Sequence, residues 1–144
     1  MSGKRKKGPI RLIISGGRDY SPGWDEWLIL NGIFKEYDIS EVLSGACPTG
    51  VDPFGEYWAK TYASIPVKQY PADWNNLSIG PVLVRMDKNG KKYNALAGPN
   101  RNEKMAQNAD AVVLFCGNRG TASMRRLAKK YKLKILYDFI EIKC

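Results

Sequence analysis

Short apolar segments alternate with segments of helical periodicity along most of the chain, and glycine-rich turns separate many of them. The predicted strands are residues 10–15, 41–44, 67–70, 111–116 and 134–137. The predicted helices are residues 24–37, 52–63, 99–108 and 121–131. This alternation predicts an α/β fold, with a parallel sheet of about five strands in the order 3-2-1-4-5 and helices on both faces.

The alternation breaks once, after Trp74. Residues 79–96 contain two β-like runs separated by Asn89-Gly90, which is a strong signal for a β-hairpin. We therefore predict a hairpin inserted into one domain that covers residues 9–144, preceded by a flexible basic arm at residues 1–8. Such an insertion acts either as a lid over the ligand, or as an oligomer-forming element or a surface addition without a role at the site.

The 144 residues include no histidine and three cysteines. Without histidine the chain has no Ser-His-Asp triad, no His-ligated zinc and no imidazole acid-base step. Cys47, Cys116 and Cys144 are odd in number and widely spaced, which suits neither a disulfide framework nor a metal site. We interpret them as reduced thiols, and we expect no bound metal.

The net charge of +9 has two main sources. Residues 4–7 carry four basic side chains, and the run RRLAKKYKLK at residues 125–134 carries six. The arm predicts weak, non-specific contact with nucleic acid, although solubility and a solvated helix face explain the same charges. No apolar run approaches the ~18 residues that a membrane span needs, so we expect no membrane partner and a cytoplasmic location.

Three glycine-rich turns follow the predicted strands 1, 2 and 4, at residues 16–19, 45–50 and 117–121. In this topology they meet at the carboxyl edge of the sheet, where α/β proteins bind ligands. Backbone N–H groups of such turns and the start of the next helix attract anions, so the pattern predicts a phosphate or ribose-phosphate site. The candidate ligand-binding residues are Gly16, Gly17, Arg18, Asp19, Ser44, Gly45, Thr49, Asp52, Arg101, Asn102, Gly117, Asn118, Arg119, Gly120 and Thr121.

The basic candidates also have simpler explanations. Arg18 could pair with Asp19 and Arg101 with Glu103, while Arg119 could be merely exposed. Neither GxGxxG nor GxxxxGK[ST] occurs in the chain, which disfavours a conventional dinucleotide dehydrogenase or a P-loop NTPase.

Five ordered motifs carry a resemblance to a known superfamily. They are GGRDY, LSGACPTGVD, PADW, AGPNRNEKM and GNRGTASM. Together they resemble the YspA/YpsA-related branch of the SLOG superfamily, to which the Lonely Guy phosphoribohydrolases and DprA also belong. The likeness covers about residues 10–137. It implies a Rossmann-like fold that binds a nucleotide or a nucleotide-derived molecule. This branch is common in bacteria and bacteriophages, which implies the host cytoplasm for a phage protein.

The chain departs from the Lonely Guy pattern at two positions. The motif's catalytic glutamate corresponds to Met124, and its second glycine corresponds to Asn118. A thioether cannot serve as a general base, so we expect binding without turnover. If the protein is an enzyme, the candidate catalytic residues are Arg101 with Asp19 or Asp52, although Asp52 is also suited to capping its helix.

Three functions follow from these observations. The first is binding of a nucleotide-derived ligand (ADP-ribose-like, NAD-derived or a nucleoside monophosphate) as a signalling-nucleotide sensor or a sequestering protein. The second is an N-glycosidase or phosphoribohydrolase of the Lonely Guy type. The third is a DprA-like binder of single-stranded DNA, through the basic runs and exposed aromatic rings. We also expect a homo-oligomer, a dimer or higher.

Overall fold

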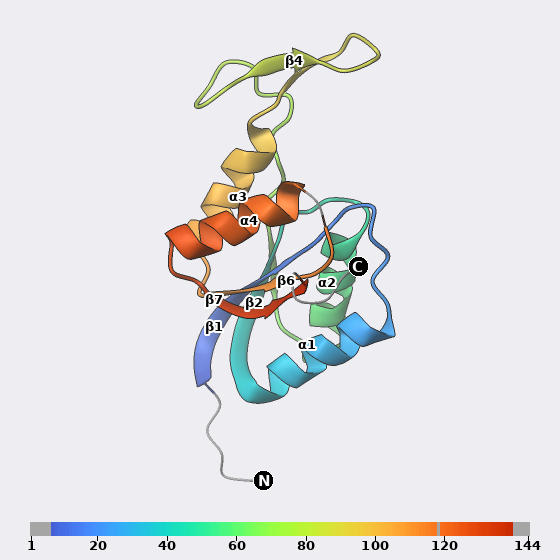
Figure 1. The fold of residues 1–144 in the computed structure, drawn as a ribbon, viewed down its shortest axis with the longest axis vertical. Helices are drawn as coiled ribbons and strands as arrows, with labels where there is room; N and C mark the ends of the chain where they lie inside the picture. Colours follow the sequence, from blue (N-terminus) through green and yellow to red (C-terminus); the bar gives the residue numbers. More distant parts are fainter. Residues whose placement is uncertain (1–6, 118, 140–144) are drawn as a thin grey trace.

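A parallel sheet of five strands forms the centre of the molecule in the computed structural model, which describes residues 7–117 and 119–139 (Figure 1). Its strand order is β3-β2-β1-β6-β7. The strands are β1 (Lys7–Ser15), β2 (Tyr37–Ser44), β3 (Val67–Gln69), β6 (Ala111–Leu114) and β7 (Lys134–Asp138). With the two hairpin strands left out of the count, this is the order 3-2-1-4-5, so the predicted topology is confirmed.

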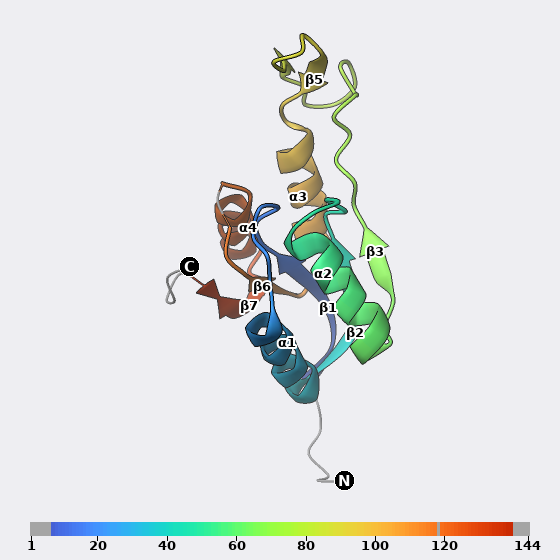
Figure 2. The same ribbon diagram turned by 90° about the vertical axis from the view of Figure 1, so that its right-hand side faces the viewer.

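Helices cover both faces of the sheet, as Figure 2 shows. The helices are α1 (Trp24–Glu36), α2 (Val51–Trp58), the π-helical turn η1 (Ala59–Ala63), α3 (Ala97–Gln107) and α4 (Arg119–Lys130). Leu30 of α1 and Trp58 of α2 belong to one apolar cluster, whereas Met105 of α3 and Leu127 of α4 belong to a second cluster. The sheet therefore separates two cores, one built with each pair of helices.

The sequence of β1 explains why it occupies the centre. Leu12 and Ile14 pack in the cluster with α1 and α2, while Ile13 packs in the cluster with α3 and α4. All three side chains are buried. A strand covered on both faces needs a continuous apolar run rather than an alternating one, and residues 12–14 supply it.

Two strands begin earlier than predicted: β1 begins at Lys7, within the predicted arm of residues 1–8, and β2 begins at Tyr37 rather than at residue 41. Tyr37 and Ile39 are buried while Asp38 and Ser40 are exposed, and Ile39 lies opposite Ile10 of β1. This alternation has the period of a strand, and pairing with β1 stabilises it. The expected extension of the helix to residue 37 is therefore wrong by one residue.

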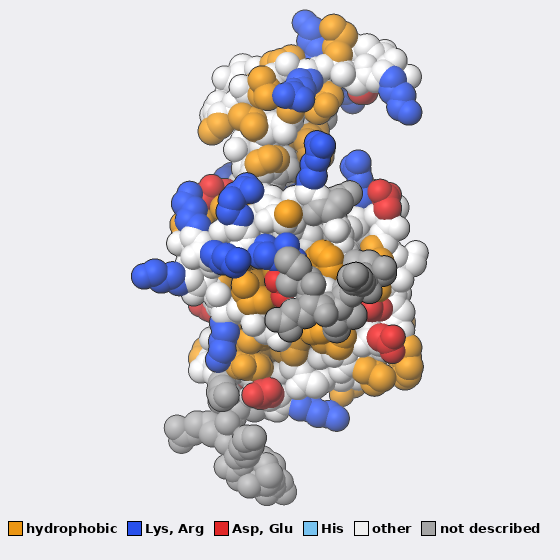
Figure 3. Space-filling view, in the orientation of Figure 1, with side chains coloured by type: hydrophobic (Ala, Val, Ile, Leu, Met, Phe, Trp, Pro, Cys, Tyr) orange, Lys and Arg blue, Asp and Glu red, His pale blue; other side chains and the backbone are white. Residues whose placement is uncertain are grey.

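The predicted hairpin is present and forms a separate sheet of β4 (Val84–Met86) and β5 (Lys92–Asn94). Gly90 in its turn has a φ of +80°, a conformation that favours glycine. The hairpin projects beyond the sheet and is joined to the rest of the molecule by a narrower neck (Figure 3). At its base the buried Asn94 accepts hydrogen bonds from Leu83 N and Leu96 N with its side-chain oxygen, which fixes the hairpin on the start of α3.

Two further expectations concern cysteines and membranes. Cys47 is a free thiol, but Cys116 is disulfide-bonded, so the expectation of three reduced thiols is wrong for Cys116.

Within residues 7–117 and 119–139, no helix has both the length and the apolar character that crossing a bilayer requires.

Candidate functional site

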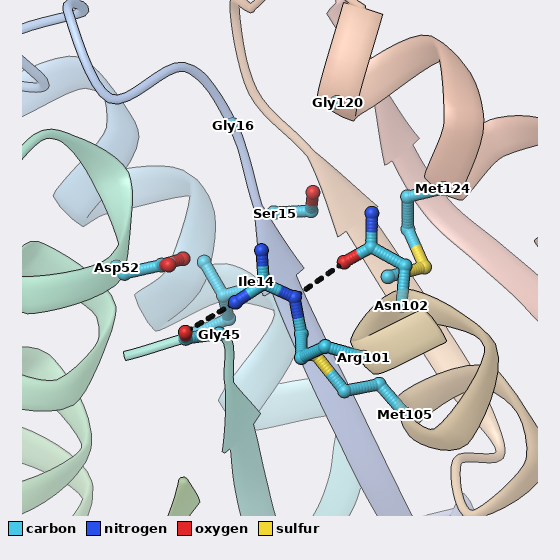
Figure 4. A pocket seen from close by; sticks show the side chains of 10 residues that line it. All are labelled: Ile14, Ser15, Gly16, Gly45, Asp52, Arg101, Asn102, Met105, Gly120 and Met124. Atoms are coloured by element: carbon cyan, nitrogen blue, oxygen red, sulfur yellow. Dashed lines mark hydrogen bonds between the residues drawn. The ribbon is translucent and has the colours of Figure 1, made fainter. Parts of the chain in front are cut away.

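A small pocket lies at the carboxyl edge of the sheet, between the ends of β1 and β2 and the helices α2, α3 and α4 (Figure 4). Its cavity volume is about 60 Å³. The lining residues are Ile14, Ser15, Gly16, Gly45, Asp52, Arg101, Asn102, Met105, Gly120 and Met124. The pocket can hold a group of the size of a phosphate, whereas complete small-molecule sites usually measure roughly 300–1,000 Å³.

Arg101 supplies the positive charge of this pocket from the second turn of α3. Its Nε donates to Asn102 Oδ1 at 2.8 Å, and its Nη1 donates to the carbonyl oxygens of Gly45 and Tyr70. All of these acceptors are uncharged. Glu103, the alternative partner, instead interacts with Lys130 and Tyr131. Among the described residues Arg101 forms no salt bridge, so its partly buried charge is available to an anion.

Asp52 faces this guanidinium from the first turn of α2 (Figure 4). Its Oδ2 accepts a hydrogen bond from Cys47 N at 3.0 Å. Burial is the largest influence and raises the pKa of Asp52 above its ordinary value, with a smaller contribution from Glu56, while the Cys47 N–H and Arg101 oppose it. Burial likewise lowers the pKa of Arg101, against the attraction of Asp52. The pocket thus combines a cation with a carboxyl group that is more easily protonated than usual.

Gly45 makes this arrangement possible. A Cβ atom at this position would lie 2.7 Å from Nη1 of Arg101 and 2.9 Å from Oδ2 of Asp52. Any larger side chain would occupy the space between the two charged groups. The glycine in the turn after β2 is therefore required by the close approach of these side chains.

The start of α4 forms the other side of the pocket, through Gly120. Next to it Thr121 is 1% exposed, and its hydroxyl has no hydrogen-bond partner among the described residues. A Cβ at Gly117 would overlap that hydroxyl and would lie 2.7 Å from Gly17 N. A buried polar atom without a partner is costly, and here it lies at the helix end that attracts anions.

The loops after β1, β2 and β6 are tied together by hydrogen bonds. Gly17 N donates to Cys116 O at 2.7 Å, and Thr49 Oγ1 donates to Arg18 O at 2.9 Å. Ser44 donates its hydroxyl proton to Glu56 at 2.6 Å and accepts from Ala46 N. Gly17, Ser44 and Thr49 therefore shape the loops around the pocket, and none of the three is among its lining residues.

None of the other described candidates, Gly117 and Thr121 included, is among the residues that line this pocket. Asp19 and Arg119 are exposed, and neither lines it. Arg18 lies in a larger hollow beside the hairpin. Asn118 lies outside the described residues. Of the two carboxylates that could partner Arg101, the structure thus brings only Asp52 into the pocket.

Three lining residues are not among the predicted ones: Ile14, Ser15 and Met105. Ile14 and Ser15 end β1, and the rule that ligands bind at the carboxyl ends of strands could have indicated them. Met105 lies one turn after Arg101 on α3, so its spacing from Arg101 could have indicated that both side chains lie on the same face of the helix. Within the described part of the chain, no group of three or more Cys, Asp or Glu side chains is placed to hold a metal ion.

Comparison with protein-family models, with curated proteins and with solved structures finds no match to this chain. What the structure establishes is a parallel five-stranded α/β sheet of the Rossmann-like kind.

Proposed function

We propose that the protein binds a nucleotide or nucleotide-derived ligand at the carboxyl edge of the sheet, with an anionic group in the pocket between Arg101 and α4. It acts as a sensor or as a sequestering protein and not as an enzyme. The five motifs that resemble the YspA/YpsA-related SLOG branch support this assignment, as does the Rossmann-like topology.

One observation carries the proposal: Arg101 is a partly buried cation whose hydrogen bonds all go to neutral oxygen atoms of the described residues. Removing a charge from water is unfavourable unless a counter-charge or several polar partners compensate it. A phosphate would supply both, through charge-assisted hydrogen bonds. The start of α4, at Gly120, would add backbone donors on the opposite side.

The test is isothermal titration calorimetry with AMP, ADP-ribose and NAD, together with mass spectrometry of small molecules released from the denatured protein. Arg101→Ala is expected to weaken binding about tenfold to a hundredfold, because it removes hydrogen bonds from a charged donor. Arg126→Ala, at an exposed position of α4, is the matched control and is expected to change nothing. No binding of the whole panel and no released nucleotide would contradict the proposal.

A second candidate function is supported by the position of Asp52. A carboxyl group with a raised pKa beside an arginine is a candidate acid-base residue, and it lies in the same pocket as Met124, which stands where the Lonely Guy motif has glutamate. An N-glycosidase would use Asp52 in that role. Release of free base from a nucleoside monophosphate is the measurement that distinguishes this candidate from binding alone.

Single-stranded DNA binding is less well supported, although Lys and Arg side chains gather over α4 (Figure 3). Arg125 is paired with Asp138 at 2.7 Å and Lys130 with Glu103 at 3.3 Å, so part of this charge is already compensated. Homo-oligomerisation stays a prediction. Two exposed apolar side chains, Ile79 close to the hairpin and Met86 on it, mark the surface to examine for it.

A further inference from the structure

A second hollow lies between the hairpin and the loop after β1. Its volume is about 600 Å³, within the usual range of small-molecule sites. It is lined by Arg18 from that loop, Trp74 from the segment after β3, and Asp87, Lys91 and Tyr93 from the hairpin, among others. This hollow is much larger than the pocket at Arg101, and the function proposed above does not yet use it.

Two aromatic rings form one wall of the hollow. The ring centroids of Trp74 and Tyr93 are 6.3 Å apart, and their planes are inclined by 65°. Trp74 is 44% exposed, which is unusual for so large an apolar side chain that faces a cavity. Asn94 N donates to Trp74 O at 2.8 Å, so the segment that carries Trp74 is bonded to the strand that carries Tyr93. The rings are thus held in place and available to a planar ligand.

The charges around the hollow favour an electron-rich partner. Arg18 and Lys91 are exposed cations. The carboxylate of Asp87 already accepts hydrogen bonds from Asn89 N and Lys91 N, both at 2.9 Å, within the hairpin turn. A planar group with hydrogen-bond acceptors therefore suits this site better than an aliphatic one, because it can stack on the rings and accept from the cations.

Trp74, which lines the hollow, and Arg101, which lines the pocket, both lie beside Gly98 on the first turn of α3. A Cβ atom there would lie 3.2 Å from Cη2 of Trp74 and 4.0 Å from Nη2 of Arg101. The edge of the indole and the guanidinium thus flank the same backbone position. One ligand can reach both, with its anionic group at Arg101 and a planar ring at Trp74.

We propose that this hollow binds the nucleobase of the nucleotide whose phosphate occupies the pocket at Arg101, with Trp74 and Tyr93 as the stacking surface. The proposal rests on the function proposed above. It assigns the inserted hairpin a role in recognising the base. The pocket at Arg101 is too small for a whole nucleotide, and the hollow supplies the space for the rest of the molecule.

The experiment compares ligands with and without a base: AMP, ADP-ribose and NAD against ribose 5-phosphate, by calorimetry. Trp74→Ala is expected to lower the affinity for the nucleotide that binds best by about tenfold, as the loss of one base-aromatic stack does. The affinity for ribose 5-phosphate should not change. Trp74→Phe keeps a ring and is expected to retain most of the affinity. Trp24→Ala removes a 71% exposed indole from α1 and serves as the matched control.

The outcomes separate this inference from the function on which it rests. In one set of outcomes, nucleotides bind the wild type while Trp74→Ala lowers the affinities for nucleotides and for ribose 5-phosphate equally, or lowers neither. In both cases the base does not stack here, and only this inference is overturned. If neither the nucleotides nor ribose 5-phosphate binds the wild-type protein, the proposed function is overturned as well. A loss in Trp74→Ala that Trp74→Phe does not restore also contradicts stacking.

Discussion

Asp52 and Arg101 approach one another beside Gly45, at the place where a side chain of that residue would lie, and both would contact a methyl group placed there. They carry opposite formal charges, yet burial raises the pKa of the acid and lowers the pKa of the base. The two charges therefore compensate each other incompletely. An anion that binds Arg101 would meet the Asp52 carboxylate as a like charge unless that carboxylate is protonated.

This relationship predicts how anion binding depends on pH. Asp52 becomes ionised as pH rises through its raised pKa, above the ordinary value of 3.8, and affinity for a phosphate ligand is expected to fall over that interval. In Asp52→Asn this fall is expected to disappear, and affinity at pH 7 to rise about tenfold, the size of a one-unit pKa effect of a nearby like charge. Asp19→Asn, which changes an exposed carboxylate outside the pocket, is the control in the same calorimetric series. Identical pH profiles for the wild type and Asp52→Asn would contradict the prediction.

The same substitution is expected to change stability. A carboxyl group whose pKa is raised by folding contributes stability that is present below its ordinary pKa and is lost as pH rises through the raised value. At pH 7 the ionised Asp52 therefore lowers the free energy of unfolding. Asp52→Asn keeps an acceptor for Cys47 N and removes the charge, so its melting temperature should exceed that of the wild type at pH 7, by a margin that shrinks toward pH 4. A variant less stable than the wild type at pH 7 would show that Asp52 is stabilised by its surroundings.

Gly45→Ala tests the space between the two charged groups. The added methyl group must displace the ends of Arg101 and Asp52, which are flexible, so the fold should survive while ligand affinity falls at least tenfold. Gly32→Ala is the control, because a Cβ at Gly32 in α1 meets no atom within 4 Å. That control should raise stability by roughly 0.5–1 kcal/mol, because alanine favours the helix, with no change in affinity. Equal affinity of Gly45→Ala and the wild type would place the ligand elsewhere.

The strand order and the identity of the edge that carries the pocket could be predicted from the sequence, because local features determine them. Apolar runs bounded by glycine specify buried parallel strands, and parallel strands bring their following turns to one edge. Gly16, Gly45 and Gly120 line one pocket for this reason, although they lie far apart in the chain.

The hollow beside the hairpin could not be predicted in this way. Its aromatic wall depends on how the hairpin is attached to the start of α3 and to the segment that carries Trp74, and the hydrogen bonds of Asn94 make that attachment. Nothing local to Trp74 or Tyr93 indicates that their rings meet. The start of β2 was misplaced for a similar reason, since pairing between Ile39 and Ile10 extends the strand beyond its apolar end.

Gly120→Asp places a carboxylate at the start of α4, where the proposed phosphate lies. A Cβ at Gly120 meets no atom within 4 Å, and an acidic residue in the first turn of a helix is favourable, so the variant should be at least as stable as the wild type. Binding of an anionic ligand should nevertheless be abolished by charge repulsion. Gly120→Ala, with the same backbone restriction and no charge, should bind within about threefold of the wild type, well under the 1.4 kcal/mol of a tenfold change. Unchanged affinity of the aspartate variant would exclude a phosphate at this helix end.

The last prediction concerns catalysis, and it depends on Met124, which is 1% exposed and lines the pocket with Arg101. If the protein only binds its ligand, incubation with nucleoside monophosphates, NAD or ADP-ribose should release no free base above background, as measured by chromatography. Met124→Glu restores the carboxylate of the hydrolase motif beside Arg101 and is expected to create weak glycosidase activity, at a cost in stability because the new charge is buried. Met124→Gln, with a similar shape and no charge, is the control and should remain inactive. Cleavage by the wild type that is lost in both Arg101→Ala and Asp52→Asn would overturn the binding-only proposal. Asp52 would then perform the role of the absent glutamate, as its position opposite Arg101 permits.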